Sequence, residues 1–278
     1  MNANKQVSLS EITSGILRAI PEAPAFVSGV RSMISAGPDK KMSIGLLLEK
    51  QARRHPAGAA LKFEDKVWSY AGFNGWVNRI AALYQKLGVA NGDVVAIMSE
   101  NRPQMLACTA AAAKLGAIAG MVNYNQRDEV LSHSLGLIKP KVMVVGDESV
   151  AAVEDTEYSP LKNQNVRHLW LGDDPALCPL GYEDLETQTR LMPSVNPEST
   201  KTILSQQPCF YIFTSGTTGM PKASVMSHGR WLKGGAGMGL LTARMNHEDT
   251  IYVPLPLYHN NALTVSWGSA LASGACVA

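Results

Sequence analysis

The sequence predicts an α/β fold, with mostly parallel sheets flanked by helices. Three observations predict it: short apolar runs alternate with amphipathic helical runs from Ser43 onward, turn-forming residues separate them, and 46% of the 278 residues are hydrophobic. Strands that alternate with helices favour parallel pairing, because each connecting helix carries the chain back to the same end of the sheet. The hydrophobic content is ordinary for a globular protein with a sizeable core.

Residues 1–42 lack this regularity, and we interpret them as an N-terminal leader before a domain over residues 43–278. The apolar side of this leader is formed by Ile16, Leu17, Ile20, Phe26 and Val30. Such a side can pack on the body, which is the commonest arrangement, or it can contact a membrane surface or a partner. Charged residues interrupt the leader, so it does not resemble a secretory signal.

Periodicity and capping residues predict the elements of the domain. Ser69 is the expected N-cap of one helix, and Gly88 closes that helix. The expected helices cover residues 44–54, 69–87, 104–115 and 127–137. The expected strands are a hairpin over 60–68 and strands over 94–98, 117–122, 142–145 and 208–213. Residues 146–200 are polar and rich in proline, so we expect irregular structure there, with one short apolar run over 168–171.

Composition and charge exclude several classes of protein. The formal net charge is only +2 and the basic residues are scattered, so we expect no nucleic-acid partner. The four cysteines form no CxxC pair, which predicts reduced thiols in a cytoplasmic protein and no zinc site. The uncharged residues from Thr250 onward include prolines and asparagines and end in small residues. We therefore expect buried core there and no membrane-spanning helix.

The last residues of the sequence are apolar. Residues 271–278 predict a helix that passes into a strand, with no polar cap after it. Domains seldom stop inside a buried strand, because its backbone groups would lack partners. We therefore expect the domain over residues 43–278 to be incomplete and a C-terminal part to be absent.

A hydroxyl-rich loop follows the expected strand over 208–213. The loop and the key residues after it are Thr214, Ser215, Gly216, Thr217, Thr218, Gly219, Pro221 and Lys222. Glycine lets a backbone turn tightly and approach a ligand closely. Hydroxyls and free backbone N–H groups can surround an oxyanion, and the lysine adds a positive charge. Since each charge-assisted hydrogen bond contributes about 1.5–3 kcal/mol, the loop suits a polyphosphate.

Other interpretations of this region fit the residues less well. A Walker A loop needs glycine before the lysine and serine or threonine after it, whereas proline and alanine flank Lys222. A nucleophile elbow needs glycine two residues to each side of the serine, and Ser215 has phenylalanine and threonine there. A plain surface loop is disfavoured by the apolar strand before it. Residues 234–239 lack GxGxxG spacing, so we expect close helix packing there.

The segment TSGTTGMPK, residues 214–222, resembles the phosphate-binding signature of the adenylate-forming superfamily, which includes acyl-CoA synthetases, peptide-synthetase adenylation domains and luciferases. A second match, LPLYH, covers residues 255–259. The segments YIFTSGTTGMPKASVMSH, PLYHNNALTV and MVNYNQRDEVLSHSLG resemble long-chain and very-long-chain fatty acyl-CoA synthetases, especially the fatty-acid-transport-protein-like branch and its actinobacterial relatives. The resemblance runs from about Ser43 to the end and implies a partial N-terminal large domain of such an enzyme.

The resemblance implies ATP-dependent activation of a long- or very-long-chain fatty acid, first to an acyl-adenylate and then to acyl-CoA. In such an enzyme the loop over 214–219 would hold the β- and γ-phosphates of ATP, with Lys222 as an auxiliary charge. Mg²⁺ would bridge the phosphates, and CoA would accept the acyl group. Tyr258, His259 and Asn260 would lie beside the acyl carboxylate, where His259 would orient it or gate the acyl tunnel. A satisfied core histidine is the alternative for His259.

The resemblance also sorts further residues by role. Trp231, Met238 and Leu240 are candidates for the lining of an acyl tunnel, although apolar helix faces are usually core. The residues that we interpret as structural are Asn123, Tyr124, Asn125, Arg127, His133 and His228.

Several parts of the family's machinery have no match in this sequence. Its adenine- and magnesium-binding glutamate, ribose-binding aspartate, hinge and adenylation lysine would lie beyond Ala278, so we expect the isolated chain to be inactive. Two alternatives stay open: an acyl-AMP ligase that loads a carrier protein, and a non-catalytic binding module. The sequence also leaves open the acyl chain length, peripheral membrane contact of a cytoplasmic protein, and a homodimer.

Overall fold

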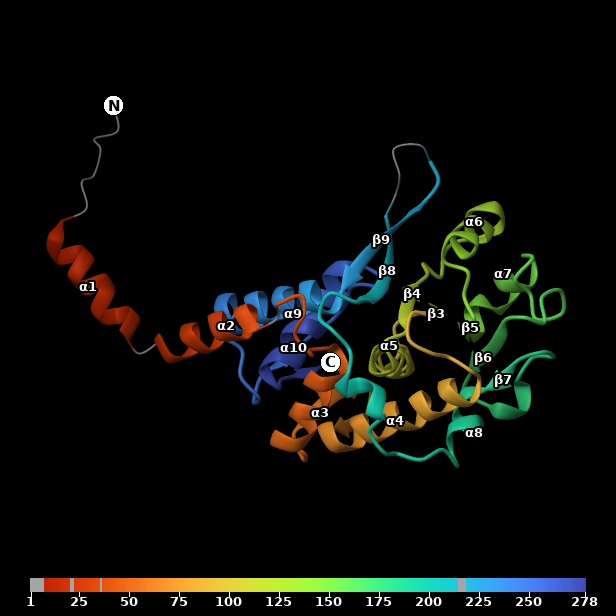
Figure 1. The fold of residues 1–278 in the computed structure, drawn as a ribbon, viewed down its shortest axis with the longest axis horizontal. Coiled ribbons are helices and arrows are strands. Elements are labelled where there is room, and N and C mark those ends of the chain that lie inside the picture. Colours follow the sequence, from red (N-terminus) through yellow and green to blue (C-terminus); the bar gives the residue numbers. More distant parts are fainter. Residues whose placement is uncertain (1–7, 21–22, 36, 215–218) are drawn as a thin grey trace.

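The computed structural model describes residues 8–20, 23–35, 37–214 and 219–278. Within them the chain forms a seven-stranded sheet and a four-stranded sheet, with helices packed around both (Figure 1). The predicted α/β class, with mostly parallel sheets flanked by helices, is therefore confirmed.

The seven-stranded sheet carries the strands that lead to the hydroxyl-rich loop. In spatial order its strands are β7 (Glu183–Asp184), β6 (Arg167–Leu171), β5 (Val142–Gly146), β3 (Val94–Met98), β4 (Ile118–Met121), β8 (Pro208–Thr214) and β9 (Lys222–Ser227). All neighbours pair in parallel except β8 and β9, which form an antiparallel pair. The carboxyl ends of β3, β4 and β8 therefore meet at one edge of the sheet.

Apolar side chains project from both faces of this sheet and form a buried cluster on each. In β3, Val95 and Ile97 belong to one buried cluster, whereas Val94, Ala96 and Met98 belong to the other, as the period of two in a strand requires. The first cluster is completed by α3 (Ile44–Arg54), α4 (Tyr70–Lys86), α5 (Pro103–Leu115) and α8 (Leu185–Thr189). The second is completed by α6 (Asp128–Ile138) and α7 (Val150–Glu154).

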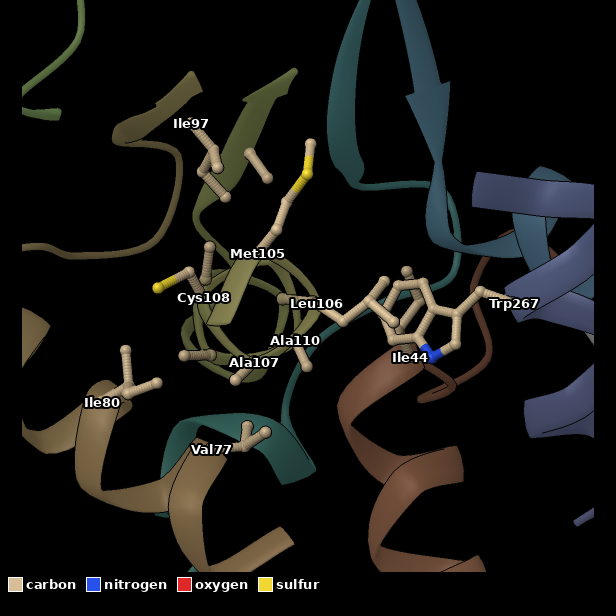
Figure 2. Packing of buried hydrophobic residues seen from close by; sticks show 14 of the residues in the cluster. Ile44, Val77, Ile80, Ile97, Met105, Leu106, Ala107, Cys108, Ala110 and Trp267 are labelled. Carbon is tan, nitrogen blue, oxygen red and sulfur yellow. The ribbon is translucent and has the colours of Figure 1, made fainter. Parts of the chain in front are cut away.

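Helix α5 lies at the centre of the first cluster and is buried on all sides (Figure 2). Its small residues allow this, because alanines let α4 and the sheet approach closely. Met105 and Leu106 supply the larger apolar contacts, and Ile44 and Trp267 pack against the same cluster. The helix begins with Pro103 at its first turn and ends at Gly116 in the left-handed conformation, with φ of 71°. Both are favoured residues at those positions.

The four-stranded sheet was not predicted. It has the order β10 (Thr250–Ile251), β11 (Cys276–Val277), β1 (Ala59–Phe63) and β2 (Lys66–Ser69). The hairpin of β1 and β2 matches the predicted hairpin. The apolar end of the chain forms helix α10 (Gly268–Ser273) and then β11, as predicted. Strand β11 lies between β10 and β1 and pairs in parallel with both.

Helix α9 (His228–Ala236) continues into the π-helical segment η5 (Gly237–Thr242), which packs against η6 (Asn261–Trp267) and α10. The glycines of α9 make this contact close. A Cβ atom on Gly235 would lie 2.5 Å from the carbonyl oxygen of Gly268, and one on Gly239 would lie 2.8 Å from Ser269. The glycine run over 234–239 thus serves close helix packing, as predicted.

The two helices of the leader differ from each other. Helix α1 (Leu9–Ala19) projects away from the body (Figure 1), and its described side chains are exposed. Helix α2 (Ala23–Ser35) packs on η5 and α9, where Gly29 is buried against Leu241. Of the three arrangements left open for the leader, packing on the body therefore describes α2, and the role of α1 stays a prediction.

The predicted helices and central strands agree with the structure within a few residues. Residues 146–200 are more ordered than predicted, since they contain α7, α8, β6, β7 and the short 3-10 helices η2 (Asp147–Ser149), η3 (Pro175–Leu177) and η4 (Glu198–Lys201). Across the described ranges, no helix has both the length and the apolarity needed to cross a membrane.

Candidate functional site

The candidate site lies at the edge where β3, β4 and β8 end. The β8–β9 hairpin places Thr214 directly opposite Lys222 in the strand register. Both side chains are exposed. Gly219, at the far end of the loop, has φ of 91° and no neighbour that an added Cβ would meet, so the backbone can turn here. Four of the predicted site residues, Ser215, Gly216, Thr217 and Thr218, lie outside the described residues.

The hairpin is anchored at its base. Phe210 and Ile212 of β8 are buried in the first apolar cluster. On the other face, Nε2 of His133 from α6 lies 3.2 Å from the carbonyl oxygen of Pro221. This contact agrees with a structural role for His133, because it joins α6 to the segment that carries Lys222.

A second segment reaches the same edge from far along the chain. Asn101, three residues beyond Met98 at the end of β3, holds residues 255–257 by its amide. Its Nδ2 donates to the carbonyl oxygen of Leu255 at 2.8 Å, and its Oδ1 accepts from the backbone N–H of Leu257 at 2.8 Å. Sequence reasoning missed Asn101. The available signal was a polar residue directly after a buried strand, where parallel sheets place their ligand-binding loops.

Tyr258 is brought to the carboxyl end of β4. Its side chain is 7% exposed, and its ring meets the ring of Tyr124 edge-to-face at 5.4 Å. Burial and the neighbouring Tyr124 raise the pKa of Tyr258, and a hydrogen bond with Asn125 opposes them. Tyr124 is therefore a neighbour of the candidate site, although the sequence suggested only a structural role for it. Since β4 pairs with β8, Tyr258 and the loop share one edge of the sheet.

His259 is exposed, and its ring lies 4.4 Å from the ring of Tyr258. Its backbone is fixed, because its N–H donates to Pro256 and its carbonyl oxygen accepts from Leu263, each at 3.0 Å. Its ring has no hydrogen-bond partner in the part of the chain that the structure describes. The alternative of a satisfied core histidine is wrong. Asn260 is exposed as well, and its Oδ1 accepts the hydroxyl of Thr264 at 2.6 Å.

His228 contrasts with His259. It is fully buried, and its Nδ1 accepts the backbone N–H of Ile44 at 3.3 Å. Burial lowers the pKa of His228 to about 3. The imidazole is therefore neutral at physiological pH and ties α9 to α3, which agrees with a structural role.

The candidates for an acyl tunnel do not lie together. Trp231 is fully buried, packs against Phe210 and Trp267, and donates from Nε1 to the carbonyl oxygen of Leu263 at 3.1 Å. Met238 is 40% exposed, and Leu240 lines a cavity at the other end of α9. Trp231 is thus a core residue of this structure.

The side chains at the carboxyl edge of the seven-stranded sheet are suited to binding an anion. Lys222 has no ion-pair partner among the residues described, so its charge is available to a ligand. The hydroxyl of Thr214 and the backbone after Gly219 add polar groups beside it. In the described ranges, no group of three or more His, Cys, Asp and Glu is placed to hold a metal ion. The described residues alone therefore form no resident Mg²⁺ site.

Comparison with known proteins identifies the family. Residues 48–278 match the family described as AMP-binding enzyme. The chain is 41% identical to the medium/long-chain fatty-acid–CoA ligase FadD6 of Mycobacterium tuberculosis over 99% of its length, and 34% identical to long-chain fatty acid transport protein 1 of Mus musculus over 84%. It also resembles the inhibitor-bound N-terminal domain of FACL13 from Mycobacterium tuberculosis, with a TM-score of 0.72 and 26% identity over 84% of this chain and 56% of that one.

The chain spans only part of these relatives, 44% of FadD6 and 35% of the mouse protein. The family match nevertheless covers the hairpin with Thr214 and Lys222 as well as the segment with Tyr258 and His259. The resemblance inferred from the two motifs is thereby confirmed, and the chain belongs to the AMP-binding enzyme family.

Proposed function

We propose that the whole protein is a ligase that activates a medium-, long- or very-long-chain fatty acid with ATP and transfers the acyl group to CoA. One observation carries this proposal: the hairpin with Thr214 and Lys222 shares a sheet edge with Tyr258 and His259. The 41% identity to a relative named as a fatty-acid–CoA ligase supports the choice of acid and acceptor. In this proposal, residues 214–219 and Lys222 bind the phosphates of ATP.

The proposed reaction is a displacement at phosphorus. The fatty carboxylate attacks the α-phosphorus of ATP, the bond to the β-phosphate breaks, and pyrophosphate leaves with the negative charge. A group that holds the leaving phosphates accelerates this step by orienting them and stabilising their charge. Lys222 suits that role, because its ammonium is exposed beside the loop and has no competing carboxylate among the described residues.

His259 would act on the acyl side. Its backbone is fixed by two hydrogen bonds, whereas its ring is exposed and free of hydrogen-bond partners within the described chain. A ring held in this way can orient a carboxylate through an N–H donor. Tyr258 would fix the direction of that ring through their contact at 4.4 Å, and Asn260 would border the same place.

Contact with a membrane surface is part of the proposal for α1. Leu9 and Leu17 of this helix are 84% and 62% exposed, and Ile12 between them is also exposed. An amphipathic helix with such a face can lie in the plane of a membrane interface. Sedimentation with lipid vesicles of the chain and of a variant lacking residues 1–20 tests this: loss of vesicle binding by the variant is expected.

The main test is fatty-acid-dependent exchange between ATP and pyrophosphate. We expect none from the 278-residue chain, and exchange from the chain fused to the C-terminal residues of FadD6 that it does not match. Exchange by the chain alone would contradict our expectation that it is inactive. A fused protein that folds but exchanges nothing with fatty acids of 8 to 24 carbons would contradict the proposed function and favour a non-catalytic module.

The acceptor needs an assay of its own. With CoA, the fused protein should release AMP and form acyl-CoA. Acyl transfer to a carrier protein, without any transfer to CoA, would instead support an acyl-AMP ligase.

A further inference from the structure

A cavity of about 550 Å³ lies between α2, α3, α9 and α10, away from the candidate site. None of its lining residues belongs to the β8–β9 hairpin or to residues 255–260. Its size is in the range of pockets that hold small organic ligands. Helix α2 lies beside α9 (Figure 1) and contributes Arg31 to the lining of the cavity.

Three cations border the cavity. Arg31 comes from α2, and Lys50 and Arg54 come from α3, where a separation of four residues places them on one helix face. Within the described residues, none of the three has an ion-pair or hydrogen-bond partner, and the neighbouring Glu49 faces Lys114 in the core instead. The described residues therefore do not neutralise the positive charge of this cluster.

The proximity of the three cations affects the pKa of Lys50. Partial burial lowers the pKa of Lys50, and the charges of Arg54 and Arg31 lower it further. The three side chains are exposed, so solvent screens part of the repulsion between their like charges. A ligand with a negative head group would relieve this repulsion.

The remaining wall is mixed. Its apolar part is formed by Leu47 of α3, Leu232 and Ala236 of α9, and Leu240 of η5, and His55 and Ser273 add polar groups. Gln51 also borders the cavity, but its amide already donates to the carbonyl oxygens of Leu271 and Ala272 at 2.9 and 3.2 Å. The cavity thus combines a cationic rim with an apolar stretch along α9 and η5. An anion without a tail, or a neutral hydrocarbon, would contact only one of these two parts.

We propose that this cavity binds a small anionic amphiphile, with a phosphate or carboxylate head group at Arg31, Lys50 and Arg54 and an apolar tail against α9. This site is additional to the proposed ligase site, and it does not depend on the ligase activity. Decyl phosphate and decanoate are suitable probes, because they share one tail and differ in the head group.

The test is isothermal titration of the 278-residue chain with each probe below its micellar concentration. Binding of decyl phosphate or decanoate is expected, with at least tenfold weaker binding of inorganic phosphate and of decanol. The variant with Arg31→Gln, Lys50→Gln and Arg54→Gln should bind the preferred probe at least tenfold more weakly. A control with Lys66→Gln, Lys86→Gln and Arg190→Gln loses the same charge at exposed positions elsewhere and should bind normally.

A second variant tests the tail. Ala272→Trp fills the apolar side at a half-buried position, so it should weaken binding of the decyl probe while thermal unfolding shows that the fold is kept. Lys222→Ala should leave binding unchanged, which separates this cavity from the proposed phosphate loop. Equal binding by the triple variant and its control, equal binding of decanol, or loss of binding in Lys222→Ala would overturn the proposal.

Discussion

Lys114 and Lys222 carry the same charge in opposite surroundings. Lys114, at the end of α5, is fully buried, and burial lowers its pKa to about 8. Four side-chain oxygens lie 2.7–3.1 Å from its Nζ and share its three N–H donors; they belong to Glu49, Asn74, Asn78 and Asn196. Lys222 is exposed at the carboxyl edge of the sheet and has no ion-pair partner among the described residues.

The two histidines repeat this contrast in part. His228 is buried, and its Nδ1 accepts a hydrogen bond while its Nε2 has no partner among the described residues; His259 is exposed, and its ring has no hydrogen-bond partner in the same ranges. Burial thus separates polar groups that hold the fold together from polar groups that a ligand can reach. Buried polar groups must be satisfied, because an unpaired one costs free energy. Substitutions in the core should therefore change stability, and substitutions at the edge should change binding alone.

The largest effect on stability is expected from Lys114→Met. Removing Lys114 leaves the buried Glu49 carboxylate with only the exposed Arg53 at 3.9 Å, and breaking a buried ion pair costs about 3–5 kcal/mol of unfolding free energy. Urea denaturation measures it, with Lys86→Met, an exposed lysine of α4, as the control. A loss below about 1 kcal/mol would show that the buried network contributes little. The double variant Lys114→Met, Glu49→Met should recover part of the loss.

A slightly smaller effect is expected from Leu106→Ala. Leu106 is 2% exposed in α5, so truncation leaves a cavity between the helix and its neighbours. Such cavities cost about 3 kcal/mol. Val225→Ala, at an exposed position of β9, is the matched control and should cost less than about 0.5 kcal/mol. Similar losses in both variants by urea denaturation would contradict the described packing of α5.

The buried His228 should make the unfolding free energy depend on pH. Because burial lowers its pKa to about 3, the unfolded chain takes up a proton below about pH 6.5 while the folded protein does not. Stability contributed by the neutral imidazole is present above pH 6.5 and falls as the pH is lowered toward 3, by about 1.4 kcal/mol per pH unit. Between pH 6.5 and 5 the chain should lose about 2 kcal/mol more than His228→Gln. Parallel curves for the two proteins would show that this histidine is protonated in the folded state.

The smallest effect on stability is expected at the carboxyl edge. His259→Ala and Lys222→Ala remove exposed side chains without hydrogen-bond partners in the described structure, so each should change the unfolding free energy by less than about 0.5 kcal/mol. Thermal unfolding measures it. A change of 2 kcal/mol in either variant would place that residue among the structural ones and remove the contrast with Lys114 and His228.

Much of the fold could be predicted because its signals are local. Ser69 caps α4 as expected, accepting the N–H of Gly72, and the apolar runs of β3, β5 and β8 are central strands. The four-stranded sheet could not be predicted, since β10 and β11 are two residues long, and β11 joins the sheet by pairing with β10 and with the distant β1. Short strands of this kind carry no periodicity of their own.

In the candidate site, too, local sequence signals could be recognised whereas long-range contacts could not. The loop with Lys222 could be found from a contiguous motif. The roles of Asn101 and Tyr124 could not, because each contacts residues about 130 or more positions away, Asn101 at Leu255 and Leu257, and Tyr124 at Tyr258. Whether His259 is buried or exposed was likewise undecided by sequence, because exposure depends on how η6 is placed.

The central claim is that Lys222 holds the phosphates of ATP. The most direct test measures fatty-acid-dependent ATP–pyrophosphate exchange by the chain fused to the C-terminal residues of FadD6, with Lys222→Ala beside Lys86→Ala. One charge-assisted hydrogen bond contributes about 1.5–3 kcal/mol, so Lys222→Ala should reduce exchange by about ten- to hundredfold while Lys86→Ala does not. Equal exchange by the two variants would contradict the claim.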